Sequence, residues 1–144
     1  MTRQEFQTIA LLRLSESKSL LKRKHYDGCC YLAGYSLEVA LKAVICRQMN
    51  NDRFFDIIRP ETARAFKIHN LRELINLAGL SQEFIDLKTT NPVLRDNWLY
   101  IQDTIKWSEQ LRYKTGLSQQ NAESMILAIS EPKNGILKWI KKYW

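Results

Sequence analysis

The segment that most constrains the fold is residues 25–48, which run for more than twenty positions almost without a helix breaker. Apolar and small side chains recur there at helical spacing, at Cys30, Ala33, Leu37, Leu41 and Val44. Further apolar or small residues fill most of the remaining circumference. A helix that is apolar on nearly all sides must be covered by other helices on several sides. The segment therefore predicts the central rod of an all-α helical bundle.

Length and composition fit this prediction. The 144 residues predict a single domain, 1–144, with a substantial core. Only three prolines and five glycines leave few turns, which favours long helices over a many-stranded sheet. The three cysteines form no CxxC pair, so they indicate neither a disulfide framework nor a zinc site, and we expect no metal and no other cofactor. All three lie in the central segment, where we expect them to pack as small apolar groups.

Nothing in the sequence predicts secretion or a membrane. Arg3 and Glu5 stand where the apolar run of a signal peptide would develop. Glu38 and Lys42 interrupt the most apolar segment before it reaches the roughly 18 uninterrupted apolar residues that a membrane helix needs. Together with the unpaired cysteines, this predicts a protein of the reducing cytoplasm.

The positive charge of the chain indicates a polyanionic partner. The net charge is +7 and the pI is about 9.4. The charge is clustered at the end of the first predicted helix, in the run Lys22, Arg23, Lys24 and His25, and again in the C-terminal tail. Clustered cations are typical of proteins that bind RNA, DNA or nucleotides, so this run is a candidate nucleic-acid-binding site. The alternative is a solvated basic surface.

Capping signals divide the rest of the chain into further helices. Residues 3–24 predict a first amphipathic helix. Asn70 followed by Glu73 predicts a capping box for a short helix that ends at Gly79. Further starts are predicted at Ser81 for a helix to residue 87, at Asn91-Pro92 for a long helix to about Tyr113, and at Ser118.

Four motifs, in this order along the chain, resemble the HEPN domain family. The first helix ends in a Leu-Leu pair, and the central helix reads AGYSLEVALKA. A His-x-Leu element then opens a short helix, and a Trp-rich segment closes with Arg-Tyr. These motifs stand at Leu20-Leu21, Ala33 to Ala43, His69 to Leu71, and Trp107 to Arg112-Tyr113. The resemblance covers nearly the whole chain.

This resemblance implies an all-α, up-and-down bundle of four to six helices, usually a homodimer. Many members are ribonucleases of toxin–antitoxin, phage-defence or RNA-processing systems. Others bind nucleotides or RNA without catalysis, or act as partners of minimal nucleotidyltransferases. Active members need no metal: an arginine stabilises charge on the phosphate, and a histidine a few residues later transfers protons while the 2′-hydroxyl attacks.

One stretch of this chain fits the catalytic pattern, Arg64 followed by His69. In the family, however, the pair belongs to a later helix, near where Arg112-Tyr113 stands here, and no histidine follows Arg112. We therefore predict a non-catalytic nucleotide- or RNA-binding module, or a nucleotidyltransferase partner, of a defence or toxin–antitoxin system. The alternative is a metal-independent ribonuclease that uses Arg64 and His69, or Arg112 with His69 brought close by the fold.

The remaining candidates are predicted to have structural or partner-pairing roles: Glu38, Lys42 and Tyr113. Glu38 lies in the most apolar helix, so it needs a specific partner, either Lys42 one turn away or Arg112. His69 precedes the expected N-cap, where the helix end would favour a neutral imidazole suited to a general base. Alternatively, its ring bonds to backbone and fixes the start of that helix.

Overall fold

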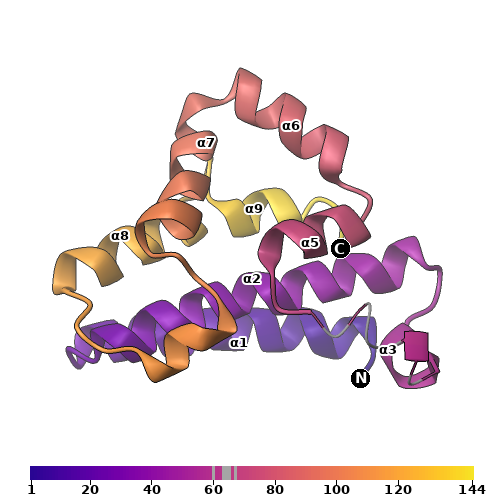
Figure 1. Cartoon of the computed structure of the whole chain (residues 1–144), viewed down its shortest axis with the longest axis horizontal. Helices are drawn as coiled ribbons and strands as arrows, with labels where there is room; N and C mark the ends of the chain where they lie inside the picture. The colour runs from indigo at the N-terminus through magenta and orange to yellow at the C-terminus, as the bar shows by residue number, and fades with distance from the viewer. Residues whose placement is uncertain (60, 63–65, 67) are drawn as a thin grey trace.

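The computed structural model describes residues 1–59, 61, 62, 66 and 68–144, and within these ranges it contains helices and no β-strand (Figure 1). The all-α prediction is confirmed. The described α-helices are α1 (Arg3–Lys22), α2 (Tyr26–Gln48), α3 (Phe54–Ile57), α5 (Leu71–Leu77), α6 (Ser81–Thr90), α7 (Pro92–Leu99), α8 (Gln119–Ser130) and α9 (Ile136–Ile140). A π-helix, η1 (Tyr100–Thr104), and a 3-10 helix, η2 (Glu109–Tyr113), follow α7. The chain is thus divided more finely than the predicted four to six helices.

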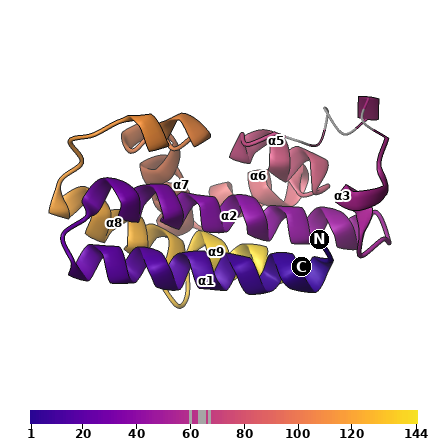
Figure 2. The same ribbon diagram turned by 90° about the horizontal axis from the view of Figure 1, so that it is seen from below.

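Helix α2 is the central rod, as predicted. It runs antiparallel to α1, and it separates α1 from most of the later helices (Figure 2). Fourteen of its 23 residues are buried. Among the described helices, α2 is the one that is long and apolar enough to cross a membrane, but 78% of its most apolar window is buried inside the fold. That burial is what the core helix of a bundle requires.

The three cysteines pack as apolar groups inside this core, which confirms their predicted role. All three are free thiols and fully buried. Burial raises the pKa of Cys29 from its ordinary value of 9.0 to about 11, and that of Cys30 to about 12. Because the thiolate is the nucleophile, these buried thiols are unreactive near neutral pH.

Most of the predicted helix starts are present. The Asn70 side chain accepts from the backbone N–H groups of Arg72 and Glu73, although no bond returns from Glu73 to complete the predicted capping box. The signals at Asn91-Pro92 and Ser118 are confirmed. The cap predicted at Ser81 is wrong, because Leu80 occupies the N-cap position of α6 and the Ser81 hydroxyl donates to Asn76 instead.

The long helix predicted from Asn91 to Tyr113 is also wrong. Helix α7 passes into the π-helix η1, and the helical path then stops at Lys106, whose φ is 55°. The break lets Trp107 turn onto α2, where its indole N–H donates to the Tyr31 carbonyl at 3.0 Å. Gly34 makes this packing possible, because a Cβ at that position would lie 2.2 Å from the indole ring. π-Helical turns inside helices frequently mark functional sites.

Candidate functional site

The candidate site is built on one stripe of α2. Tyr31, Tyr35, Glu38 and Lys42 follow one another at intervals of four, three and four residues, which places them on one face of the helix. Two groups of side chains assemble on this stripe. The first, here the carboxylate cluster, consists of Glu38, Lys42 and His69. The second, here the tyrosine platform, consists of Tyr31, Tyr35, Arg112 and Tyr113.

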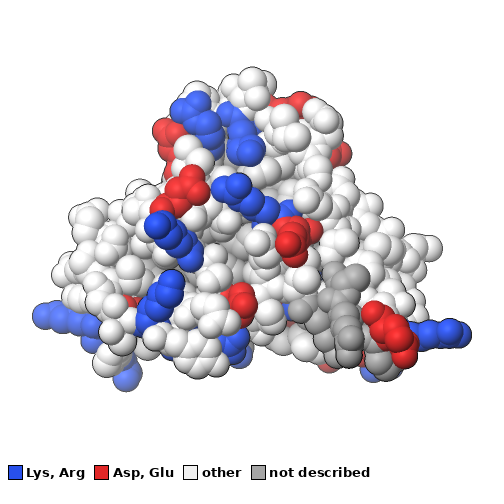
Figure 3. Space-filling model, viewed as in Figure 1, with Lys and Arg blue, Asp and Glu red and all other residues white. Residues whose placement is uncertain are grey.

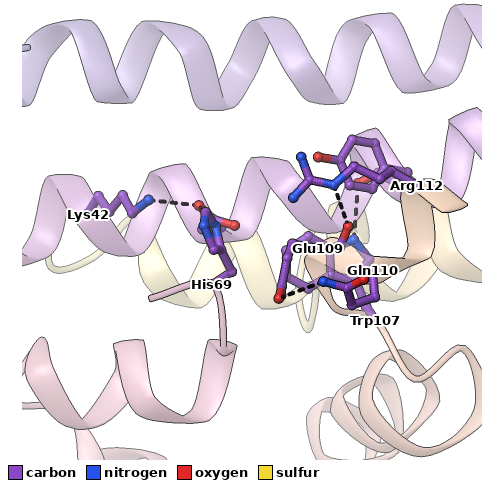
Figure 4. A network of polar contacts seen from close by, with 8 residues as sticks. Lys42, His69, Trp107, Glu109, Gln110 and Arg112 are labelled. Carbon is purple, nitrogen blue, oxygen red and sulfur yellow. Dashed lines mark hydrogen bonds and ion pairs between the residues drawn. The ribbon is translucent and has the colours of Figure 1, made fainter. Parts of the chain in front are cut away.

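In the carboxylate cluster, Glu38 is the central acceptor. Its side chain is 1% exposed. One oxygen, Oε1, accepts from Lys42 Nζ at 2.7 Å and lies 2.9 Å from His69 Nδ1 (Figure 4). The Glu38–Lys42 pairing is thus confirmed, whereas the alternative pairing of Glu38 with Arg112 is wrong. The second oxygen, Oε2, is buried without a hydrogen-bond partner among the described residues.

This contact sets the orientation of the His69 ring. A carboxylate only accepts hydrogen bonds, so Nδ1 carries the proton and Nε2 is the ring nitrogen left for another partner. Asn70, the next residue, caps α5 and fixes the backbone from which the ring projects. His69 therefore bonds to a side chain of α2, and its ring has no bond to the backbone of the described residues, contrary to one prediction.

His69 lines a pocket of about 450 Å³, here the His69 pocket, between the start of α5 and the segment from η1 to η2. Two carboxylates, Glu73 and Glu109, also line it, and none of the described lining residues is Arg or Lys. Gln102, from the π-helix, contributes an amide nitrogen that is buried without a hydrogen-bond partner in the described part of the chain. Such a pocket repels phosphate.

Glu109 stands between the two groups (Figure 4). A hydrogen bond from its own backbone N–H lowers the pKa of Glu109, and the Gln110 amide and the neighbouring His69 and Arg112 side chains lower that pKa further. Its carbonyl oxygen accepts from Arg112 Nε at 2.7 Å. Glu109 therefore remains ionised beside His69 and fixes the course of the Arg112 side chain.

The tyrosine platform presents aromatic rings and a guanidinium at the surface. The rings of Tyr31 and Tyr35 lie 3° from parallel, with centroids 6.2 Å apart. The Arg112 guanidinium carbon lies 6.0 Å from the Tyr31 ring centroid and 5.4 Å from that of Tyr113. Tyr113 is 75% exposed. Burial, with Glu38 and Tyr31 close by, raises the pKa of Tyr35, so its ring stays neutral.

Two contacts hold the platform segment against α2. Trp107 fixes its beginning, through the packing on Gly34 described above. Asp27, in the first turn of α2, fixes its end, because its carboxylate accepts from the backbone N–H groups of Gly116 at 3.3 Å and Leu117 at 2.8 Å. Arg112 and Tyr113 are therefore carried by a segment that is anchored on both sides.

The structure separates the residues proposed for catalysis. No hydrogen bond or ion pair joins Arg112 to His69 in the part of the chain that the structure describes, and Figure 4 shows the two side chains apart, with Glu109 between them. The prediction for Arg64 lies outside the described residues. Of His69 and Arg112, only His69 is among the described residues that line the His69 pocket.

The basic run at the first turn is exposed, as its predicted role requires. Lys22, Arg23, Lys24 and His25, here the basic turn, are all solvent-accessible where α1 turns into α2. Figure 3 shows blue side chains projecting from this end of the molecule, at the left. His25 is the N-cap residue of α2, and Tyr31 lies six residues further, about 9 Å along the helix axis. The basic turn therefore lies within two helical turns of Tyr31 along α2.

Sequence reasoning missed several residues that build the site, namely Asp27, Gly34, Trp107 and Glu109. One signal for the platform was available, because Tyr31, Tyr35, Glu38 and Lys42 share helical spacing. Asp27, Gly34 and Trp107 act through contacts with distant parts of the chain, which local spacing does not reveal, whereas Glu109 holds Arg112 three residues later. Among the described residues, no group of three or more His, Cys, Asp or Glu could hold a metal ion.

Comparison with known proteins gives one finding. The family model of the HEPN domain matches residues 4–131, which is most of the chain. No curated protein and no solved structure matches significantly. The helical architecture agrees with the family match. The chain therefore belongs to the HEPN domain family, which associates it with nucleotide- or RNA-related function.

Proposed function

We propose that this protein binds single-stranded RNA or nucleotides without cleaving them. The observation that carries the proposal is the placement of the Arg112 guanidinium over both Tyr31 and Tyr113 at the surface. Single-stranded nucleic acids are bound by aromatic and guanidinium planes on which bases stack, together with cations that follow the phosphates. The tyrosine platform offers the first of these components and the basic turn offers the second.

The platform suits stacking because its members are already ordered. Arg112 is held by the Glu109 carbonyl, and the segment that carries it is anchored by Trp107 and Asp27. A preorganised surface loses little conformational entropy when a base stacks on it. Tyr113 is the most exposed of the three tyrosines, so its free face is available to a base.

Phosphates would follow the cations on either side of the platform. Lys114 is exposed directly after Tyr113, and the basic turn lies one and a half helical turns before Tyr31. The His69 pocket, in contrast, carries two carboxylates and no described Arg or Lys. An RNA backbone would therefore lie along the platform and not in the His69 pocket.

The test is the binding of a fluorescein-labelled single-stranded RNA, measured by anisotropy at fixed salt. Base stacking contributes about 1–3 kcal/mol per base, so Tyr113→Ala and Arg112→Gln should each weaken binding about tenfold. The matched control is Arg95→Gln, an exposed arginine on α7 that pairs with Asp96. Its affinity should equal that of the wild type. Unchanged affinity of both platform variants would contradict the proposal.

Further parts of the proposal concern partners and setting. We infer that the protein works as a homodimer or beside a minimal nucleotidyltransferase, in a prokaryotic defence or toxin–antitoxin system. Three free cysteines in the core suit a reducing compartment such as the cytoplasm. Sedimentation of the purified chain, alone and with a candidate nucleotidyltransferase, tests the two kinds of partner separately. A chain that stays monomeric and does not bind the nucleotidyltransferase would contradict this part of the proposal.

A metal-independent ribonuclease is the second candidate, and one observation favours it. Glu38 holds His69 Nδ1 at 2.9 Å, which leaves Nε2 free to accept a proton from an attacking 2′-hydroxyl. The test is the cleavage of a mixed RNA pool in EDTA by the wild type and by His69→Ala. Cleavage that is lost in a folded His69→Ala variant would establish this candidate. RNA binding without cleavage would support the binding module.

A further inference from the structure

A second cavity lies on the other side of α5 from the His69 pocket. It has a volume of about 430 Å³ and is lined by residues of α5, α6 and α7. Arg72 borders this cavity, whereas its neighbours Leu71 and Glu73 border the His69 pocket. We call it the Arg72 cavity. It shares no described lining residue with the tyrosine platform or the basic turn.

The charge of the Arg72 cavity is opposite to that of the His69 pocket. Arg72 and Lys88 both line it, and none of the described lining residues is Asp or Glu. The Arg72 guanidinium has one acidic contact, to Asp103 at 3.5 Å, in which both side chains are about 60% exposed. An ion pair with this distance and this exposure contributes little binding energy. Figure 3 shows blue side chains across this upper part of the molecule, over α5 to α7.

The wall and rim of the Arg72 cavity are apolar. Phe84 and Trp98 pack edge to face, with ring centroids 4.7 Å apart. Lys88 Nζ stands 4.7 Å from the centroid of the Phe84 ring. At the rim, Ile85 and Leu99 are 54% and 40% exposed, which is high for large apolar side chains beside one cavity. An apolar ligand would cover surface that is otherwise left to water.

A polar pair gives the cavity a directed donor. The Ser81 hydroxyl donates to Asn76 Oδ1 at 2.6 Å, and both residues line the cavity. Since this bond fixes the amide oxygen of Asn76, its NH₂ group is left to donate elsewhere. Two cations and one oriented amide therefore border an aromatic and aliphatic wall. Binding sites for small molecules likewise combine an apolar wall with a few placed polar groups.

We propose that the Arg72 cavity binds a small aromatic anion. The ring of the ligand packs against Trp98, Ile85 and Leu99, and its phosphate or carboxylate pairs with Arg72 and Lys88. Charge-assisted hydrogen bonds from arginine and lysine are suited to both anions. This site is separate from the RNA-binding surface proposed above, so one can fail while the other stands.

The test is calorimetric titration of the full chain with 1-naphthyl phosphate, which joins an aromatic ring to a phosphate. We expect saturable binding of one molecule per chain. 1-Naphthol lacks the anion and inorganic phosphate lacks the ring, so each should bind at least about tenfold more weakly. A parallel titration with 1-naphthoate shows whether the cavity prefers phosphate or carboxylate. Binding of either aromatic anion supports the proposal.

Variants then place the ligand in the cavity. Arg72→Gln and Lys88→Gln each remove one cation from an accessible side chain, and each should weaken 1-naphthyl phosphate about tenfold. Lys138→Gln, on the exposed side of α9, is the matched control and should bind as the wild type does. Absence of saturable binding for both aromatic anions would overturn the proposal. So would equal affinity of the wild type, Arg72→Gln and Lys88→Gln.

Discussion

The carboxylate cluster and the tyrosine platform stand on the same stripe of α2, yet they differ in how their polar groups are satisfied. Glu38 is 1% exposed, and Lys42 and His69 both contact it. In the platform, Arg112 contacts a backbone carbonyl and two aromatic rings, and Tyr113 is 75% exposed. The first group pairs its buried charge within the fold, although Glu38 Oε2 has no hydrogen-bond partner among the described residues. The second group leaves a guanidinium and aromatic faces accessible to a ligand.

The difference separates the two uses of polar residues on a core helix. A buried charge must be paired, because an unpaired one is costly in a medium of low polarity. An exposed guanidinium over aromatic rings is stable without an ion pair, so it can meet a ligand. Position along α2 therefore decides whether a polar residue stabilises the bundle or faces a partner.

The largest effect is expected from Gly34→Ala, which disturbs the contact that links both groups. The new Cβ would lie 2.2 Å from the Trp107 ring. We expect a loss of about 3 kcal/mol in the free energy of unfolding, as in other overpacked cores, and weaker RNA binding because the platform segment shifts. Urea denaturation and anisotropy measure the two effects.

Gly28→Ala, also in α2, is the matched control. There the added Cβ meets only a Leu20 methyl group at 3.2 Å, at the end of a side chain that can move. Alanine is favoured over glycine within a helix by about 1 kcal/mol, so this variant should be as stable as the wild type or more so. Equal stability of Gly34→Ala and Gly28→Ala would show that Trp107 does not depend on the space at Gly34.

Glu38→Gln sharpens the comparison, because it removes the charge from the carboxylate cluster alone. The amide oxygen can still accept from both Lys42 and His69, but the negative charge that pairs with the Lys42 ammonium is lost, and an amide NH₂ takes the place of the buried Oε2, which has no partner among the described residues. We expect a loss of about 2 kcal/mol in the free energy of unfolding and little change in RNA affinity. Glu123→Gln, on the exposed surface of α8, should change neither quantity. A stable Glu38→Gln variant that no longer binds RNA would instead place Glu38 in the ligand site.

A triple substitution of Lys22, Arg23 and Lys24 by Gln tests the basic turn beside the platform. Each lost phosphate contact should lower the slope of log affinity against log salt by about 0.7 for a single strand. The folded state should be nearly unaffected, since all three side chains are exposed. Anisotropy titrations at several salt concentrations give the slope.

The C-terminal tail offers the control for that experiment. Lys138, Lys141 and Lys142 are equally exposed, so their replacement by Gln removes the same charge from another part of the molecule. If the two triple variants lower the slope equally, binding responds to the net charge and not to the basic turn.

The smallest effect on stability is expected from a rise in pH. Burial raises the pKa of Tyr35, Cys29 and Cys30 above their ordinary values, so the folded chain keeps these protons at a pH where the unfolded chain has lost them. Their stabilising contribution is therefore complete below the ordinary pKa values and is lost as the pH rises above about 9. The urea midpoint should fall over this range. Tyr35→Phe should reduce the part of the fall above about pH 10, and a fall identical to the wild type would contradict the role given to Tyr35.

The architecture was predictable because it depends on local patterns. The apolar circumference of α2 required a central position in a helical bundle, whatever the other helices did. Caps at Asn70, Asn91 and Ser118 were predicted correctly, because the bond between a cap and its helix spans three residues or fewer. The family match extends over the same region.

The site was only partly predictable, because its contacts join distant parts of the chain. Glu38 needed a partner by the rule for buried charge, and Lys42 was within local reach. That His69 would be the other partner, and Arg112 would not, depends on how the start of α5 and the segment that follows Trp107 pack on α2. The sequence by itself determined which side chains must be buried and where helices begin. Tertiary structure alone decided which polar groups meet, since that depends on close packing between segments whose separation along the chain gives no sign of their contact.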